Sequence, residues 1–295
     1  MERFFDHAYL APPIVNVSVI CANYNHARYL PDMIDSIHQS TVRPEELIIV
    51  DDGSTDNSLE VLDAYSHLDY LKVISLPENR GQAAALNEAL KLASQKYIMR
   101  IDSDDYLDHT RIEKQFTFLE IHPEVAVVGT NVTYFENKTG KLINHSNYPI
   151  GMEKIQKRFK GGGNGVLHGT VMMRRQALQK LRYNPGVEPS TDYELFSRMT
   201  REGYRFQNLR ESLTFMRIYR DQKKANKFAE IKMNFKLRYA IFGARASKLA
   251  VYTYYIHIHF YHKYLFETHS FLRYIYLTVS SLFRPGKLWR RLSGW

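Results

Sequence analysis

Residues 46–56 read ELIIVDDGSTD, and the fold that we expect follows from the change from apolar to polar residues inside this stretch. Its first half is an apolar run of the length of a buried strand, and its second half is a polar turn that begins at Asp51. The same change occurs twice more, where VNVSVIC at 15–21 leads into ANYN and KYIMRI at 96–101 leads into DSDD. The sequence therefore predicts three buried strands that each end in polar residues.

Segments with helical periodicity separate these strands. Apolar residues spaced three and four apart predict helices at 29–40, 58–66 and 81–94, with a further strand at 71–76. This alternation predicts an α/β fold with a mostly parallel sheet covered by helices on both faces. Ligands of such sheets bind beyond the carboxyl ends of the strands, which is where the polar turns lie. Less regular elements are predicted further on: a helix at 111–121, strands at 125–134 and 171–174, a helix at 191–202 and a helical tail from about 225.

The composition excludes several classes of protein. The chain has 295 residues, of which 44% are hydrophobic, so wholesale disorder is excluded. Its single cysteine, Cys21, excludes an internal disulfide framework and a Cys-rich zinc module. The longest apolar run of the tail, 271–283, contains Arg273 and is too short for a membrane span. The first 15 residues lack the pattern of a signal peptide.

The net charge of +9 is unevenly distributed along the chain. Residues 1–216 carry 24 Lys and Arg against 28 Asp and Glu, whereas residues 217–295 carry 16 against 3 and are rich in aromatic side chains. We therefore expect an α/β domain at 1–225 and a helical, basic and aromatic region at 226–295 that lies on an anionic membrane surface. The alternative for this region is a pair of helices packed on the domain. We expect no nucleic-acid partner, because no recognised binding motif accompanies the charge.

The turn at 102–105 carries the clearest chemical signal. Asp102 and Asp104 bring two carboxylates to a strand end, and carboxylate oxygens suit a hard divalent cation such as Mg²⁺ or Mn²⁺. One carboxylate and a substrate diphosphate are enough to hold such an ion. The alternative is a solvated, Asp-rich turn. The turn at 51–56 is likewise compatible with a glycine bend followed by a helix cap.

Four motifs in register give the sequence a family resemblance. They are Asn23-Tyr24-Asn25, Asp51-Asp52-Gly53-Ser54, Glu78-Asn79-Arg80-Gly81 and Asp102-Ser103-Asp104-Asp105. In order and spacing they resemble the family 2 glycosyltransferases of GT-A fold, over about residues 15–225. The resemblance implies an inverting transferase that takes a sugar from a nucleotide-diphosphate donor, most often a UDP-sugar, with Mg²⁺ or Mn²⁺ as cofactor.

Each motif supplies residues to the donor site that the resemblance implies. In these roles we expect Tyr24 and Asp52 at the base, Asp102 at the ribose or sugar, Asp104 on the metal, Asn79 and Arg80 elsewhere along the nucleotide-sugar, and Asp105 close enough to share the metal.

On the acceptor side, Asp192 matches the catalytic base of the family, with Thr191 in the position of a preceding Glu. By its residues alone, Asp192 is also a carboxylate favoured by the positive end of a helix dipole. His168 is expected either to line the acceptor pocket or to be structural. The glycines within 161–165 do not fit a phosphate-binding P-loop, and they predict a mobile loop near the acceptor site.

Three departures from the family pattern affect these expectations. The segment Ala22-Asn23-Tyr24 lacks the Pro-Thr that is common before Tyr-Asn, Leu86 replaces a frequent Arg, and Gln222 replaces a His and cannot copy an imidazole ligand. The chain also lacks a Gln-X-X-Arg-Trp motif, which is evidence against a processive cellulose-type or hyaluronan-type synthase.

The sequence thus predicts a metal-dependent glycosyltransferase of hexosyltransferase type at the cytoplasmic face of the inner or plasma membrane. Its expected acceptor is a polyprenyl-linked or cell-surface glycan in a bacterium. Two alternatives stay open. A nucleotidyltransferase would need a basic, Gly-rich phosphate loop after the first strand, and residues 22–25 do not form one. A non-catalytic nucleotide-sugar-binding protein would lack donor hydrolysis and transfer.

Overall fold

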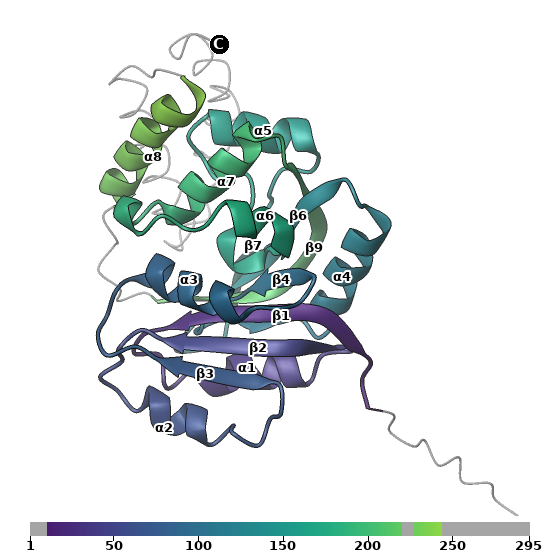
Figure 1. Cartoon of the computed structure of the whole chain (residues 1–295), viewed down its shortest axis with the longest axis vertical. Coiled ribbons are helices and arrows are strands. Elements are labelled where there is room, and N and C mark those ends of the chain that lie inside the picture. The colour runs from purple at the N-terminus through teal and green to yellow at the C-terminus, as the bar shows by residue number, and fades with distance from the viewer. Residues whose placement is uncertain (1–10, 220–226, 244–295) are drawn as a thin grey trace, which may run out of the picture.

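The computed structural model of the protein describes residues 11–219 and 227–243, with the side chains of 227–229 left out. Nine strands of this described part form one sheet, in the order β3-β2-β1-β4-β8-β6-β9-β5, and β7 pairs with β6. Helices cover both faces of the sheet (Figure 1). The predicted α/β class is confirmed.

The first half of the sheet is parallel, as predicted. Strand β1 lies between β2 and β4, and β2 also pairs with β3, each in parallel register. The predicted strands and helices of this half are confirmed to within a few residues. Their bounds are β1 Ile14–Asn23, α1 Leu30–His38, β2 Arg43–Asp51, α2 Ser58–Asp63, β3 Leu71–Ser75, α3 Gln82–Leu92 and β4 Tyr97–Arg100.

The second half mixes parallel and antiparallel pairs. Strand β6 runs parallel to β9 over most of its length, whereas β8 pairs antiparallel with both β4 and β6. The short strands β5 and β7 pair antiparallel with β9 and β6. The bounds in this half are β5 Tyr106–Leu107, α4 Arg111–Ile121, β6 Val125–Glu136, β7 Leu142–His145, α5 Met152–Lys160, η1 His168–Thr170, β8 Met172–Arg174, α6 Arg175–Lys180, η2 Pro185–Val187, α7 Thr191–Arg201 and β9 Arg205–Ile218.

The two longest elements of this half without a predicted counterpart are β9 and α5. Strand β9 contains Arg205, Arg210, Glu211 and Arg217, and its burial does not alternate regularly, so a period-two pattern is hidden. Helix α5 follows Gly151 and is mostly charged, but it does bury Ile155 and Phe159, four residues apart on one face. The spacing of Ile155 and Phe159 could have predicted helix α5 from the sequence, whereas the strand conformation of β9 depends on pairing with β6.

The core consists of two apolar clusters, one on each face of the sheet. One joins the sheet to α3, α5, α6 and α7, and the other joins it to α1, α2 and α4. In α1 the apolar residues at helical spacing, Leu30, Met33, Ile34 and Ile37, are all fully buried. Burial of each such side chain contributes roughly 1.5–3 kcal/mol, so the sheet is a firm base for the loops at its edge.

The described part of the C-terminal region is one helix, α8 (Lys227–Phe242), and it packs on the α/β domain. Ile231 and Phe235 are buried, and the ring of Phe235 is 3.4 Å from the position that a Cβ on Gly162 would take. Figure 1 shows α8 beside α7. No helix in the described ranges is both long and apolar enough to cross a membrane. The boundary at 225 stays a prediction, and the rest of the predicted tail lies outside the described residues.

Candidate active site

The carboxyl ends of three neighbouring parallel strands meet at one edge of the sheet. Strand β1 ends at Asn23, β2 ends at Asp51, and β4 leads into Asp102. The Nδ2 atom of Asn23 donates to Oδ2 of Asp51 at 2.8 Å, which ties the first two ends together. The polar turns predicted from the sequence therefore lie side by side.

Asn25 connects the first two turns through hydrogen bonds. Its side-chain oxygen accepts the backbone N–H groups of Thr55 at 2.7 Å and Asp56 at 3.2 Å, and its own N–H donates to Ser54 Oγ at 2.9 Å. Asn25 has a positive φ of 56°, a conformation that Asn tolerates better than most residues. Tyr24, 43% exposed, stands on this fixed turn with its ring available to a ligand.

Asp52 is buried and holds the turn that precedes α3. Its two carboxylate oxygens accept the backbone N–H groups of Arg80 at 2.8 Å and Gly81 at 2.9 Å. Burial raises the pKa of Asp52, and these two hydrogen bonds oppose the rise. Asn79 and Arg80 are exposed on the turn that Asp52 holds. The base contact expected of Asp52 stays a prediction.

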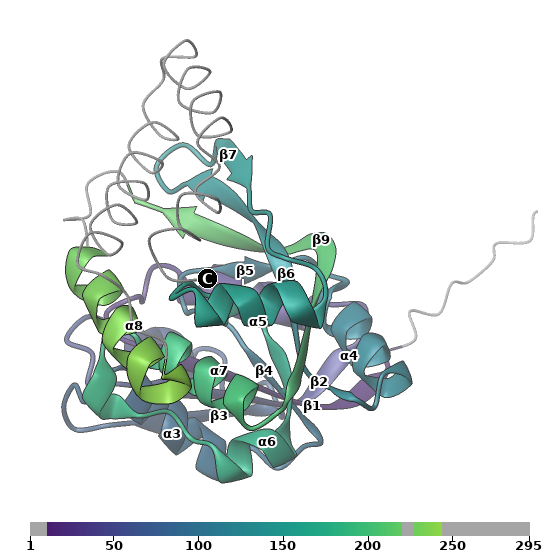
Figure 2. The ribbon, with the colours of Figure 1, turned by 90° about the horizontal axis from the view of Figure 1, so that it is seen from above.

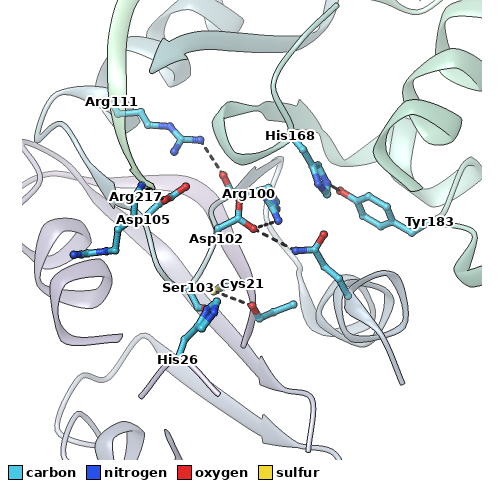
Figure 3. Close-up of polar contacts among 12 residues, drawn as sticks. Cys21, His26, Arg100, Asp102, Ser103, Asp105, Arg111, His168, Tyr183 and Arg217 are labelled. Carbon is cyan, nitrogen blue, oxygen red and sulfur yellow. Dashed lines mark hydrogen bonds and ion pairs between the residues drawn. The ribbon is translucent and has the colours of Figure 1, made fainter. Parts of the chain in front are cut away.

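Asp102 is held by a buried arginine from its own strand. Both terminal nitrogens of Arg100 donate to the Asp102 carboxylate, and Gln82 Nε2 donates to Oδ1 at 3.2 Å (Figure 3). Behind this pair, Arg111 Nη2 donates to the Arg100 carbonyl at 2.9 Å. Burial and the Arg100 charge lower the pKa of Arg111 to about 9. The clamp fixes Asp102 and balances its charge.

Asp104 and Asp105 differ in their exposure. Asp104 is partly exposed, whereas Asp105 is 2% exposed and accepts the Arg217 backbone N–H at 3.0 Å. Burial, followed by the charge of Asp102, raises the pKa of both carboxyls, and that of Asp105 rises furthest. Asp105 is thus a buried support for the loop, and the expectation that it shares the metal stays a prediction.

The carboxylates at 102–105 fit a divalent cation as part of its coordination shell rather than as a complete set of ligands. No group of three or more His, Cys, Asp or Glu suited to a metal occurs within residues 11–219 and 227–243. Burial and, after it, repulsion by the Asp102 carboxylate nevertheless raise the pKa of Asp104, and a cation would relieve this repulsion. Mg²⁺ and Mn²⁺ commonly take one or two carboxylates and complete their shells with water and substrate phosphate.

Asp192 lies in the first turn of helix α7, close enough to Arg100 for the two charges to interact. Its Oδ2 accepts from Asn164 Nδ2 at 2.7 Å, and its Oδ1 accepts from the Tyr193 N–H at 2.7 Å. Burial raises the pKa of Asp192 to about 6, with the charge of Glu230 on α8 adding to the rise. A carboxylate with this pKa is still ionised at neutral pH and is basic enough to accept a proton.

His168 is packed inside the protein. It is 8% exposed, its Nε2 lies 2.8 Å from the Tyr183 hydroxyl, and its ring meets Phe196 edge-on (Figure 3). Burial and the Arg100 charge lower its pKa well below the usual value. Of the two roles considered for His168, burial supports the structural one. The neighbouring Gly169 lies against Asp102, since a Cβ there would be 2.9 Å from its Oδ2.

The glycine-rich stretch at 161–165 is packed rather than open. Gly162 has φ +88° and faces Phe235, and a Cβ on Gly165 would lie 2.7 Å from Ile155 Cγ2. These glycines allow close packing between α5, α8 and the sheet, and the mobility expected of this loop stays a prediction. Asn164 at the centre of the stretch donates to Asp192, and nothing local in the sequence distinguished it.

Comparison with known proteins identifies the class. The family model for glycosyl transferase family 2 matches residues 18–182. EpsE of Bacillus subtilis (strain 168), whose name assigns it to the glycosyltransferases, is 35% identical over 220 residues, covering 72% of this chain and 76% of EpsE. The O-antigen biosynthesis glycosyltransferase WbnJ of Escherichia coli is 33% identical over 208 residues, covering 69% and 80%. This chain belongs to glycosyl transferase family 2 and is a glycosyltransferase, so neither alternative class is retained.

Solved structures match the fold. S. aureus TarS 1–349 in complex with UDP-GlcNAc has a TM-score of 0.61 at 19% identity, covering 76% of this chain and 66% of that one. The mannosyltransferase PcManGT from Pyrobaculum calidifontis, in complex with GDP-Man and Mn²⁺, has a TM-score of 0.58 at 19% identity, covering 77% and 66%. These matches confirm the GT-A fold.

The packing of Gly53 against the turn at 78–79 gives a stability test. Gly53 has φ +71°, and an added Cβ would lie 2.5 Å from the backbone carbon of Glu78, whereas Gly140 has φ +67° and open space around it. Gly140→Ala should cost about 1–2 kcal/mol from backbone strain alone. Gly53→Ala should cost about 1–3 kcal/mol more, because the backbone of the 78–79 turn must move. Urea unfolding of both variants measures the difference, and equal costs would contradict the close packing.

Proposed function

We propose that this glycosyltransferase is metal-dependent and inverting, and that it moves a sugar from a nucleotide-diphosphate donor, a UDP-sugar first among them, to a hydroxyl of a lipid-linked or cell-surface glycan. One observation carries the proposal: Asp192 lies close enough to Arg100, which pairs with Asp102, for the Arg100 charge to act on it, and burial raises the pKa of Asp192 to about 6. The relatives named for O-antigen and amylovoran biosynthesis support a glycan acceptor. The UDP-GlcNAc, GDP-Man and Mn²⁺ complexes of the structural neighbours support the donor class and the metal.

On the donor side, the three strand-end turns bind the nucleotide-sugar. Tyr24 offers an exposed ring to the base, and Asp102, fixed by Arg100, offers acceptor oxygens to hydroxyls of the ribose or sugar. Asp104 would hold Mg²⁺ or Mn²⁺, which when bound supplies Lewis-acid neutralisation of the leaving diphosphate. Because the Arg100 charge already balances Asp102, Asp104 is the carboxylate left to bind the cation.

On the acceptor side, Asp192 acts as the base. It takes the proton of the acceptor hydroxyl while that oxygen forms a bond to the anomeric carbon and the bond from this carbon to the diphosphate oxygen breaks. Attack from the side opposite the leaving group inverts the anomeric centre. Asn164 donates to Asp192 Oδ2 and so limits the directions in which the carboxylate can turn.

Removal of the base gives the test of this assignment. Asp192→Asn should lower kcat by about 10²–10⁴-fold, because an amide cannot take the proton. For the unchanged protein, kcat/KM should fall about tenfold per unit below pH 6 and level off above it, since only the ionised carboxylate is a base. Nucleoside-diphosphate release is measured with whichever nucleotide-sugar most raises the Tm in Mn²⁺.

The matched control is Asp63→Asn, which changes an exposed carboxylate on α2. Its kcat and pH profile should equal those of the unchanged protein. If Asp192→Asn keeps more than about a tenth of the activity, another group is the base.

We also propose that the enzyme works on an anionic membrane surface, at the cytoplasmic face. Exposed cations support this among the described residues as well as in the basic C-terminal sequence. Lys154 and Lys157 on α5 and Lys232 and Lys236 on α8 are exposed, and none of the four makes an ion pair with a described residue. Figure 2, seen from above, shows α5 and α8 on the same side of the molecule. Lys and Arg near an anionic leaflet contribute about 1 kcal/mol each.

Charge-reversal variants distinguish membrane binding by this surface from a general effect of net charge. Lys154→Glu with Lys157→Glu should weaken binding to phosphatidylglycerol-containing vesicles by at least about 30-fold, from about 1 kcal/mol per cation removed. Lys141→Glu with Lys180→Glu makes the same change of charge at exposed lysines elsewhere and should have little effect. Vesicle co-sedimentation of the full chain measures both, and equal losses in the two variants would contradict the proposed surface.

A further inference from the structure

The end of β9 lies against the Asp102–Asp105 turn. Arg217 Nε donates to the Asp104 carbonyl at 2.8 Å, and the Arg217 backbone N–H donates to Asp105 Oδ1 at 3.0 Å. These contacts join segments more than 100 residues apart in the sequence (Figure 3 shows Arg217 beside Asp105). The backbone of the carboxylate turn is therefore held from β9.

Arg217 is itself fixed on several sides. Its Nη2 donates to Asp32 Oδ2 at 2.6 Å, and its guanidinium lies 4.6 Å from the ring centre of Tyr29 and 4.8 Å from that of Phe135. The side chain is 8% exposed. A guanidinium paired and stacked in this way has little freedom, so the last residues of β9 are a rigid support.

Tyr219 follows Arg217 by two residues and reaches the carboxylate of Asp104. Its hydroxyl donates to Asp104 Oδ2 at 2.8 Å, and its ring packs edge-on against Tyr29 with 5.8 Å between ring centres. The backbone N–H of Asp104 also forms a hydrogen bond with this carboxylate, which is partly exposed. Tyr219 thus fixes Oδ2 of a carboxylate that a ligand can still reach.

We infer that Tyr219 is a positioning residue that holds Asp104 with Oδ1 turned toward the donor and its cation. The inference rests on the proposed function for the cation at Asp104. Carboxylates that bind metals are themselves hydrogen-bonded as a rule, and loss of such a partner typically lowers metal affinity about 10–100-fold. A neutral phenol suits this role because it fixes the carboxylate and leaves its negative charge in place.

Substitution of Tyr219 by Phe removes the hydroxyl and keeps the ring. In a titration with Mn²⁺ in the presence of UDP, the Mn²⁺ concentration at the midpoint of the Tm rise should increase about 10–100-fold in Tyr219→Phe. The paramagnetic resonance signal of free Mn²⁺ should give the same shift without any activity being measured. Tyr106→Phe is the control, since the Tyr106 ring stacks on Phe215 of β9 with 4.7 Å between ring centres, and the hydroxyl that donates to Asp104 is that of Tyr219.

The outcomes are distinct. The inference predicts an unchanged midpoint for Tyr106→Phe, a shifted midpoint for Tyr219→Phe, and no Mn²⁺-dependent Tm rise for Asp104→Ala. If Tyr219→Phe binds Mn²⁺ as tightly as the unchanged protein or more tightly, the positioning role is wrong while the metal site stands. If the unchanged protein shows no Mn²⁺ binding with UDP, the metal of the proposed function fails, and this inference fails with it. Tm values in EDTA show whether each variant is folded.

Discussion

Repulsion between carboxylates is the constraint on which the rest of this site depends. Parallel pairing of β1, β2 and β4 brings the turns with Asp51 and Asp52 and the turn with Asp102, Asp104 and Asp105 to one edge of the sheet. Such a concentration of negative charge would destabilise the fold if it were left unbalanced. Each carboxylate therefore has its own donors, and the choice of donor decides what the carboxylate can do.

The donors divide the carboxylates by function. Asp51 and Asp52 accept hydrogen bonds within and between turns and so shape the backbone. The charge of Asp102 is balanced by its ion pair with Arg100, and Asp105 is buried and accepts a hydrogen bond from the Arg217 backbone N–H. Asp104 alone among these five in the described structure is both partly exposed and bonded through one oxygen to a neutral hydroxyl. Its negative charge remains available, which is what binding of a cation requires.

Local patterns predicted the first half of the fold because each element there carries its own signal. Apolar runs ended by Asp or Asn marked β1, β2 and β4, and the spacing of Leu30, Met33, Ile34 and Ile37 marked α1. Strand β9 could not be predicted in this way, since its Arg217 is stabilised by partners, Asp32 and Phe135, that only the tertiary structure supplies. Asn164, Arg100 and Tyr219 could not be singled out from the sequence for the same reason, since their roles depend on the carboxylate that each contacts in the tertiary structure. The roles that the family resemblance implies for single residues stay predictions, although burial supports a structural role for His168.

We expect this sheet edge to bind a nucleoside diphosphate through a divalent cation held at Asp104. Calorimetric titration of UDP into the full chain, once with Mn²⁺ and once with EDTA, measures this binding. We expect saturable binding with Mn²⁺ and binding at least about tenfold weaker with EDTA, because the cation neutralises the diphosphate beside the carboxylates. Equal affinity in the two titrations would contradict it.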